Sequence, residues 1–143
     1  MNAVDTNAVL NRLSVIHNRS LPTYLSYAVP WIAQRNGNAS ETLSAIVADH
    51  RRTVDRLGEM IMENGGDVDP GEFPMLYTAW HDVSFDFVLD KMIEKQRQDI
   101  TAIGECVEQL TLAPLAKSVA EEALGAAKGH LESLEELKTP ADS

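Results

Sequence analysis

Residues 39–74 have the sequence ASETLSAIVADHRRTVDRLGEMIMENGGDVDPGEFP, which combines an amphipathic helix with a long loop. Six apolar residues and one histidine recur at helical spacing and form one side of the helix: Leu43, Ile46, Val47, His50, Val54, Leu57 and Ile61. The pair Gly65-Gly66 ends the predicted helix, which spans residues 39–64. The loop that follows, residues 65–74, extends to about 33 Å. It is therefore long enough to run the length of a helix bundle.

Three other segments carry apolar stripes at the same spacing. They predict helices over residues 6–35, 78–110 and 114–138. Four helices with one apolar face each bury those faces most economically as a four-helix bundle. We therefore expect an all-α chain with one domain over residues 1–143. The loop between helices two and three is a crossover, so these two helices run parallel.

Two prolines interrupt the first predicted helix. Pro22 and Pro30 each remove a backbone hydrogen bond, so this helix should be kinked or locally broken. A freed carbonyl is expected near Asn18, four residues before Pro22.

The charge composition excludes several classes of function. Twelve Lys and Arg residues against 22 Asp and Glu residues leave a net charge of −10. That charge repels phosphate backbones and anionic lipids, so we expect no nucleic-acid and no membrane partner. The single cysteine, Cys106, excludes an internal disulfide and a Cys-based zinc or iron–sulfur site. The N-terminal residues lack the blocks of a secretory signal, and a cytoplasmic location is expected.

Each predicted helix carries one hydrogen-bonding residue within its apolar stripe: His17, His50, Gln96 and His130. Residues equidistant from the turn of an antiparallel hairpin lie level. Gln96 and His130 are centred on the turn at Ala113. His17 and His50 are centred about three residues from their turn, a height difference of about 5–10 Å. We therefore expect each pair to lie nearly level, whereas the relative height of the two hairpins stays open.

Two kinds of chemistry suit such a layer. A buried polar group without a partner costs about 1–3 kcal/mol, so these side chains must bond one another, water or a metal ion. Three imidazoles and an amide oxygen suit one tetrahedral transition-metal ion, zinc or copper, and iron less well. A hydrogen-bonded polar layer that sets the helix register is the metal-free alternative.

Four segments resemble one known family. The segment Asp49–Glu59 with its Gly65-Gly66 terminus resembles the His-containing helix of the ferritin-like superfamily, which includes bacterioferritins and rubrerythrins. Gly129–Leu134 resembles the second such segment, and residues 96–107 are similar to the third helix. His17, followed by Tyr24, matches a first helix that normally has Glu before Tyr. The resemblance runs from about Leu10 to Leu137 and implies a bundle that forms homo-oligomers, with a dimer expected.

The resemblance also implies a position for a metal centre. Family members that oxidise iron hold two ions with one Glu from each of two helices and Glu-x-x-His from the other two. The matching positions in this chain are His17, Val47, His50, Gln96, Ala127 and His130. Both histidines are kept and all four carboxylates are replaced. Because paired iron ions need anionic ligands, a di-iron ferroxidase is not expected. A shifted register of the third helix places Asp90 or Glu94 at the position of Gln96.

The sequence therefore predicts a ferritin-like bundle with one of two functions. In the first, one transition-metal ion is held by His17, His50 and His130, with Gln96 or water completing its shell. In the alternative, a metal-free bundle acts as a structural or interaction module and forms a homodimer. A phosphate loop, a nucleotide fingerprint and a serine nucleophile motif are all absent, so no catalytic residue or substrate is assigned.

Overall fold

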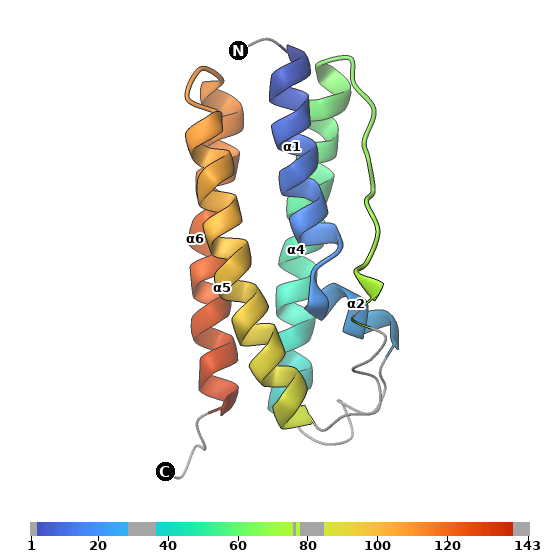
Figure 1. The fold of residues 1–143 in the computed structure, drawn as a ribbon, viewed down its shortest axis with the longest axis vertical. Helices are drawn as coiled ribbons and strands as arrows, with labels where there is room; N and C mark the ends of the chain where they lie inside the picture. The colour runs from blue at the N-terminus through green and yellow to red at the C-terminus, as the bar shows by residue number, and fades with distance from the viewer. Residues whose placement is uncertain (1–2, 29–36, 76, 78–84, 139–143) are drawn as a thin grey trace.

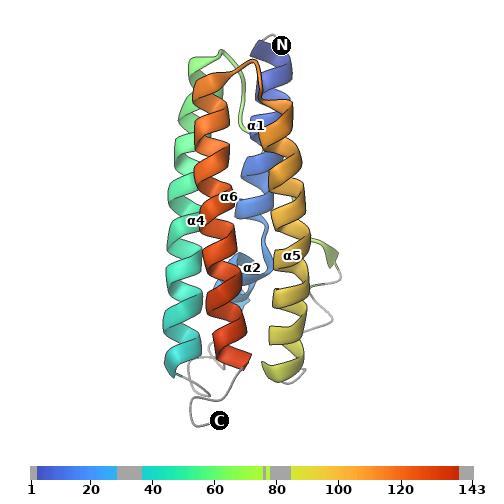
Figure 2. The same ribbon diagram turned by 90° about the vertical axis from the view of Figure 1, so that its left-hand side faces the viewer.

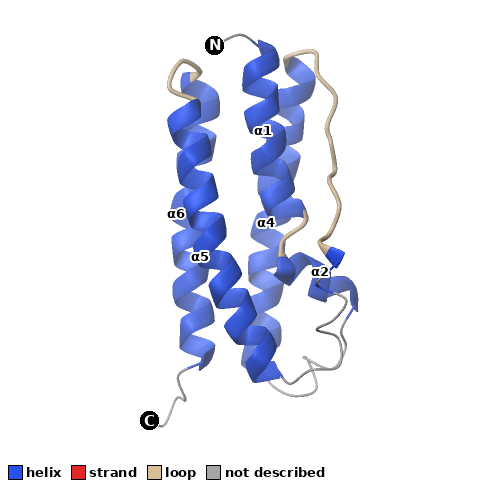
Figure 3. Ribbon diagram, in the orientation of Figure 1, coloured by secondary structure: helices blue, strands red, loops and turns tan. Residues whose placement is uncertain are grey.

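The described part of this chain consists of helices joined by turns and one long loop. In the computed structural model these are residues 3–28, 37–75, 77 and 85–138. The helices are α1 (Ala3–Asn18), α2 (Leu21–Ala28), α4 (Gly37–Glu63), α5 (Phe85–Gln109) and α6 (Pro114–Lys138). Within those residues no strand is present, which confirms the all-α prediction (Figure 3). Residues 78–84, predicted to begin the third long helix, lie outside the described residues.

Within the described residues, the first predicted helix (6–35) is broken into two helices before Pro22, which confirms the predicted break. The chain leaves the helical path after Asn18 and resumes it at Leu21. Pro22 lies in the first turn of α2, where a missing N–H costs no intrahelical bond. Ser20 caps this turn, since its Oγ accepts a bond of 3.3 Å from the Thr23 amide. Residues 29–36, the rest of the predicted helix, lie outside the described part of the chain.

The segment after α4 is the predicted crossover. It runs back beside α1, from the top of the bundle in Figure 1 toward α2. Asn11 of α1 holds it, donating from Nδ2 to the Asp67 carbonyl (3.3 Å) and accepting from the Asp69 amide (2.8 Å). Arg19 Nε donates to the Pro70 carbonyl at 2.9 Å. In Figure 1 both α4 and α5 run from the bottom of the bundle to its top, so the two helices are parallel, as predicted.

The core has two apolar clusters with polar side chains between them. One cluster lies near α2 and includes Leu21, Leu25, Leu43, Ile46, Leu89, Met92 and Leu134. The other lies toward the α5–α6 turn and includes Leu10, Leu13, Leu57, Ile61, Ile103, Cys106 and Leu110. The first cluster is formed by α2, α4, α5 and α6, and the second by α1, α4, α5 and α6. Figure 2 shows the packing of these helices from a second side. No described helix has both the length and the hydropathy needed to cross a bilayer.

Candidate metal centre

The four polar residues singled out in the sequence all lie in the bundle interior, one on each long helix. Their exposed fractions are 4% for His17, 5% for His50, 3% for Gln96 and 9% for His130. Each lies at a position of its helix that faces the core, between the two apolar clusters. Helical periodicity therefore predicted the direction of all four side chains.

The three imidazoles form a row with His50 in the middle. The ring centres of His17 and His50 are 5.1 Å apart, with the ring planes at 90°. The ring centres of His50 and His130 are 5.5 Å apart, at 67°. No ring contact joins His17 to His130 in the described part of the chain. The contact between His50 and His130 shows that the two helical hairpins lie at the same height here.

One nitrogen of each imidazole is held by the protein. His17 Nδ1 lies 2.8 Å from the Leu13 carbonyl, which only accepts, so Nδ1 carries the proton. His50 Nδ1 lies 3.0 Å from Ser20 Oγ. The Ser20 hydroxyl itself donates to Thr23 Oγ1 at 2.9 Å, so it accepts from His50 Nδ1–H. In both residues the lone pair of the neutral ring is therefore on Nε2.

His130 has the opposite tautomer. Its Nε2 lies 2.8 Å from Asp49 Oδ2, so Nε2–H donates to the carboxylate and the lone pair is on Nδ1. Within the described residues, Nδ1 is buried and has no hydrogen-bond partner. Asp49 also pairs with Arg52, and burial lowers the pKa of His130, so the imidazole is neutral. The Nδ1 lone pair of His130 is therefore a fully buried acceptor that no described residue satisfies.

Gln96 is bonded to the helix that carries His130. Its Nε2 donates to the Ala127 carbonyl at 2.9 Å, one turn before His130. The alternative residues for this position, Asp90 and Glu94, are exposed. Asp90 pairs with Lys138 at 2.7 Å, and Glu94 lies 3.6 Å from the ammonium of Lys91. Only Gln96, of these three residues, faces the interior.

Burial keeps the three imidazoles neutral. It lowers the pKa of His17, His50 and His130 below the ordinary value of 6.5. For His50 the pKa falls to about 2, first through burial and then through the neighbouring His17 and His130 rings. At neutral pH each ring therefore offers a lone pair rather than a positive charge.

A small cavity adjoins two of the rings. It has a volume of about 110 Å³ and is lined by His17, His50 and Thr23, and by Arg51 and Asp55 on its outer side. It places the rings of His17 and His50 next to a space that reaches the α4 surface.

Sequence reasoning did not identify Asp49 or Ser20 as hydrogen-bond partners of the imidazole layer. Asp49 is adjacent to His50, yet its partner is 81 positions away, so no local pattern marks the contact.

The donor set does not fit a pair of iron ions. The interior positions hold neutral imidazoles and an amide, and Asp49 is occupied by His130 and Arg52. Hard ions that repel each other need bridging carboxylates, which this layer lacks. Nor are three or more His, Cys, Asp or Glu side chains of the described residues gathered around a point that could hold a metal ion.

The bundle and crossover define the ferritin-like fold. This chain is similar in structure to a bacterioferritin of Desulfovibrio desulfuricans, with a TM-score of 0.78 over 95% of this chain and 79% of that chain. That protein has a diiron site that was solved in different catalytic states. The two sequences are 14% identical, so the likeness shows the fold alone. No family model and no curated protein matches the sequence.

Proposed function

We propose that this ferritin-like bundle binds one transition-metal ion through His17, His50 and His130, with zinc or copper preferred over iron. One observation carries the proposal: each imidazole is held by one nitrogen, and the other nitrogen of His130 is a buried lone pair without a partner among the described residues. Metal-ligating histidines characteristically bond their second ring nitrogen to a carbonyl or carboxylate in this way. The neutral imidazole is also the form that binds a metal ion.

Two pairs of rings, His17 with His50 and His50 with His130, are spaced as two ligands of one metal ion would be. At a Zn–N distance of about 2.0–2.1 Å, two imidazoles on one tetrahedral ion have ring centres about 5 Å apart. The observed separations of His50 from His17 and His130 are 5.1 and 5.5 Å. His17 and His130 are not in ring contact, so a shared ion requires one ring to rotate. The rotation costs about 1 kcal/mol, and weakening the hydrogen bond of the rotating ring costs about 1 kcal/mol more. Binding of zinc at a structural site supplies about 10 kcal/mol or more.

The fourth ligand in this proposal is the Gln96 amide oxygen or a water molecule. A bound ion with an open position supplies Lewis-acid or redox chemistry. The residues of this chain bind and orient that ion: Ser20 and the Leu13 carbonyl hold two rings, and Asp49 holds the third. None of these residues indicates a substrate, and we propose no reaction.

Metal analysis of protein purified without a His-tag tests this function. We expect at least half an equivalent of zinc or copper per chain after incubation with each ion and gel filtration. His50→Leu should abolish this binding. His81→Gln is the matched control, because it removes the one histidine outside the proposed centre. Less than half an equivalent in the unmutated protein, or equal loss in the control, would contradict the proposal.

A metal-free structural or interaction bundle is the second candidate. It is favoured by one observation: each of the four polar residues already has a protein partner, the Leu13 and Ala127 carbonyls, Ser20 and Asp49. In this case a chelator leaves the melting temperature of the protein unchanged. Replacing His50 and His130 together by Leu leaves or raises that temperature, because an apolar layer needs no partners. A large fall in the variant, matched by a chelator effect in the unmutated protein, would exclude this candidate.

The family resemblance implies a homo-oligomer without fixing its number of subunits, and we propose a homodimer. Sedimentation equilibrium measures the mass directly, and a mass of about 31 kDa, twice the 15.7 kDa of the chain, would support it. A monomer at every concentration would contradict the homodimer without bearing on metal binding.

A further inference from the structure

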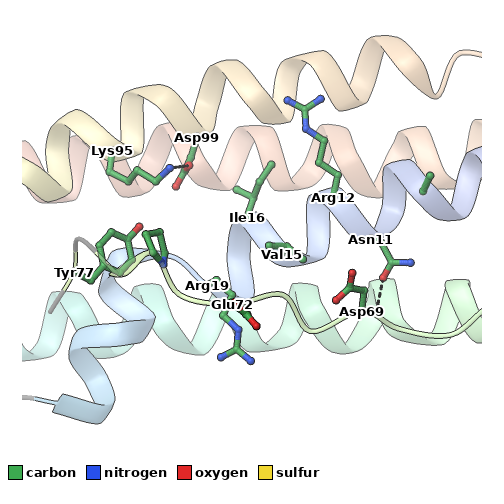
Figure 4. Close-up of a pocket in the computed structure, with 12 residues that line it drawn as sticks. Asn11, Arg12, Val15, Ile16, Arg19, Asp69, Glu72, Tyr77, Lys95 and Asp99 are labelled. Atoms are coloured by element: carbon green, nitrogen blue, oxygen red, sulfur yellow. Dashed lines mark hydrogen bonds and ion pairs between the residues drawn. The ribbon is translucent and has the colours of Figure 1, made fainter.

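A second polar site lies outside the imidazole layer, in a cavity between α1, α5 and the crossover (Figure 4). Its volume is about 590 Å³, within the usual range of about 300–1,000 Å³ for pockets that enclose small ligands. None of the four interior polar residues lines it. Val15 and Ile16 of α1 and Pro74 of the crossover supply apolar walls, and Asp99 and Lys95 of α5 supply a charged wall.

Asp99 is a buried carboxylate with few partners. The residue is 7% exposed and lines the cavity. In the described part of the chain its one ionic partner is Lys95, whose Nζ lies 3.5 Å from Oδ1. Charge-assisted hydrogen bonds of this kind are normally about 2.7–2.9 Å long, and a carboxylate has about four acceptor positions. Asp99 therefore has acceptor capacity that the described residues do not fill.

Two of the three cationic side chains that line the cavity, Arg12 and Arg19, bond residues outside its lining. Arg12 pairs with Glu105 at 2.9 Å, outside the cavity lining. Arg19 donates to the Pro70 carbonyl at 2.9 Å. Lys95 is the exception, because its contact with Asp99 is long and its side chain is 38% exposed. It can turn to solvent without losing much hydration, which leaves Asp99 to another donor.

We propose that this cavity binds a small organic cation, a protonated primary amine with an apolar body. Its ammonium group donates to Asp99 in place of Lys95, and its hydrocarbon part packs against Val15 and Ile16. The net charge of −10 further favours a cationic ligand over an anionic one. Glu72 of the crossover also lines the cavity and adds a second negative charge (Figure 4). This site is independent of any metal in the bundle interior.

Calorimetric titration with benzylamine tests the proposal, with benzyl alcohol and benzoate as neutral and anionic probes of the same shape. The titration is run at pH 8, above the Asp99 pKa of about 6. We expect benzylamine to bind at least about tenfold more tightly than either analogue. Equal affinity for benzyl alcohol, or no measurable benzylamine binding at millimolar concentration, would overturn the proposal.

Two variants of the charged wall should act in opposite directions. Asp99→Asn should weaken benzylamine binding by about tenfold or more. Lys95→Met keeps the hydrocarbon stem and removes the internal competitor, so it should strengthen binding several-fold. Lys91→Met is the control, since Lys91 lies on the same helix and does not line the cavity. Weaker binding in Lys95→Met, or unchanged binding in Asp99→Asn, would overturn the assignment of the ammonium to Asp99.

Discussion

His130 Nε2 lies 2.8 Å from Asp49 Oδ2, so one contact joins the last helix to the residue that precedes His50 on α4. Successive residues of a helix differ in direction by about 100°. Asp49 therefore lies at the flank of the bundle while His50 faces its interior. The carboxylate selects the His130 tautomer that leaves the Nδ1 lone pair in the polar layer. Asp49, at the flank of α4, thus orients the interior ring of His130 through this hydrogen bond.

Asp49→Asn should weaken the proposed metal binding. The carboxamide no longer selects the Nε2–H tautomer of His130, and loss of such a partner typically costs about 10- to 100-fold in metal affinity. Competition with a fluorescent zinc chelator measures the affinity. Asp90→Asn, which removes an exposed carboxylate of α5, serves as the control and should bind zinc normally. Unchanged affinity in Asp49→Asn would show that His130 orientation does not contribute to binding.

The metal-free protein should lose stability as the pH falls below 6.5. The pKa of His50 is lowered by burial from 6.5 to about 2, so the unfolded chain binds a proton that the folded chain does not. The contribution is fully present above pH 6.5 and is lost toward lower pH, at up to about 1.4 kcal/mol per pH unit for one histidine. Urea unfolding at pH 7.5, 6 and 5 in the presence of a chelator measures it. His50→Leu should show a shallower dependence, and an equal slope in this variant would contradict the prediction.

Asp99 has the opposite pH dependence. Burial raises the pKa of this carboxyl from 3.8 to about 6, so the folded state favours the protonated acid. The stabilisation of the folded state by this protonation is fully present below pH 3.8 and is lost as the pH rises through about 6. At pH 7.5 the free energy of unfolding of Asp99→Asn should therefore be about 1–3 kcal/mol higher than that of the unmutated protein. The two proteins should converge near pH 3.5, and a variant that is less stable at pH 7.5 would contradict the prediction.

The crossover should be sensitive to a methyl group at Gly71. Gly71 has φ +67°, and a Cβ added there would lie 2.7 Å from Val15 Cγ1. Gly65 has φ +80° with no atom within 4 Å of the same added Cβ, so Gly65→Ala measures the backbone strain alone. That strain costs about 1–2 kcal/mol, and Gly71→Ala should cost about 1–3 kcal/mol more. Chemical denaturation of both variants measures the difference.

A double variant separates the two causes at Gly71. Adding Val15→Ala to Gly71→Ala should recover part of the lost stability, because it removes the atoms that the new methyl meets. Additive losses in the double variant would show that the crossover does not approach Val15 as closely as the structure places it.

Local patterns of the chain were sufficient for much of the architecture. The helical spacing around His50 and His130 predicted inward side chains, and the residues from Gly65 to Pro74 predicted the crossover that makes α4 and α5 parallel. These features depend on the period of one helix or the reach of one loop, so neighbouring residues encode them. The break in the first helix was also predicted from Pro22, although its position, before α2, depends on the cap formed by Ser20.

The tertiary structure alone decided how the two hairpins align. Packing of the apolar clusters sets the relative height of the two hairpins. It places the ring centres of His50 and His130 5.5 Å apart, whereas His17 and His130 are not in ring contact. The partnership of Asp49 with His130 and the burial of Asp99 beside a cavity have the same origin. Each depends on rigid helices placed by many distant side chains at once, and the identity of a residue does not encode the neighbour it will meet across the bundle.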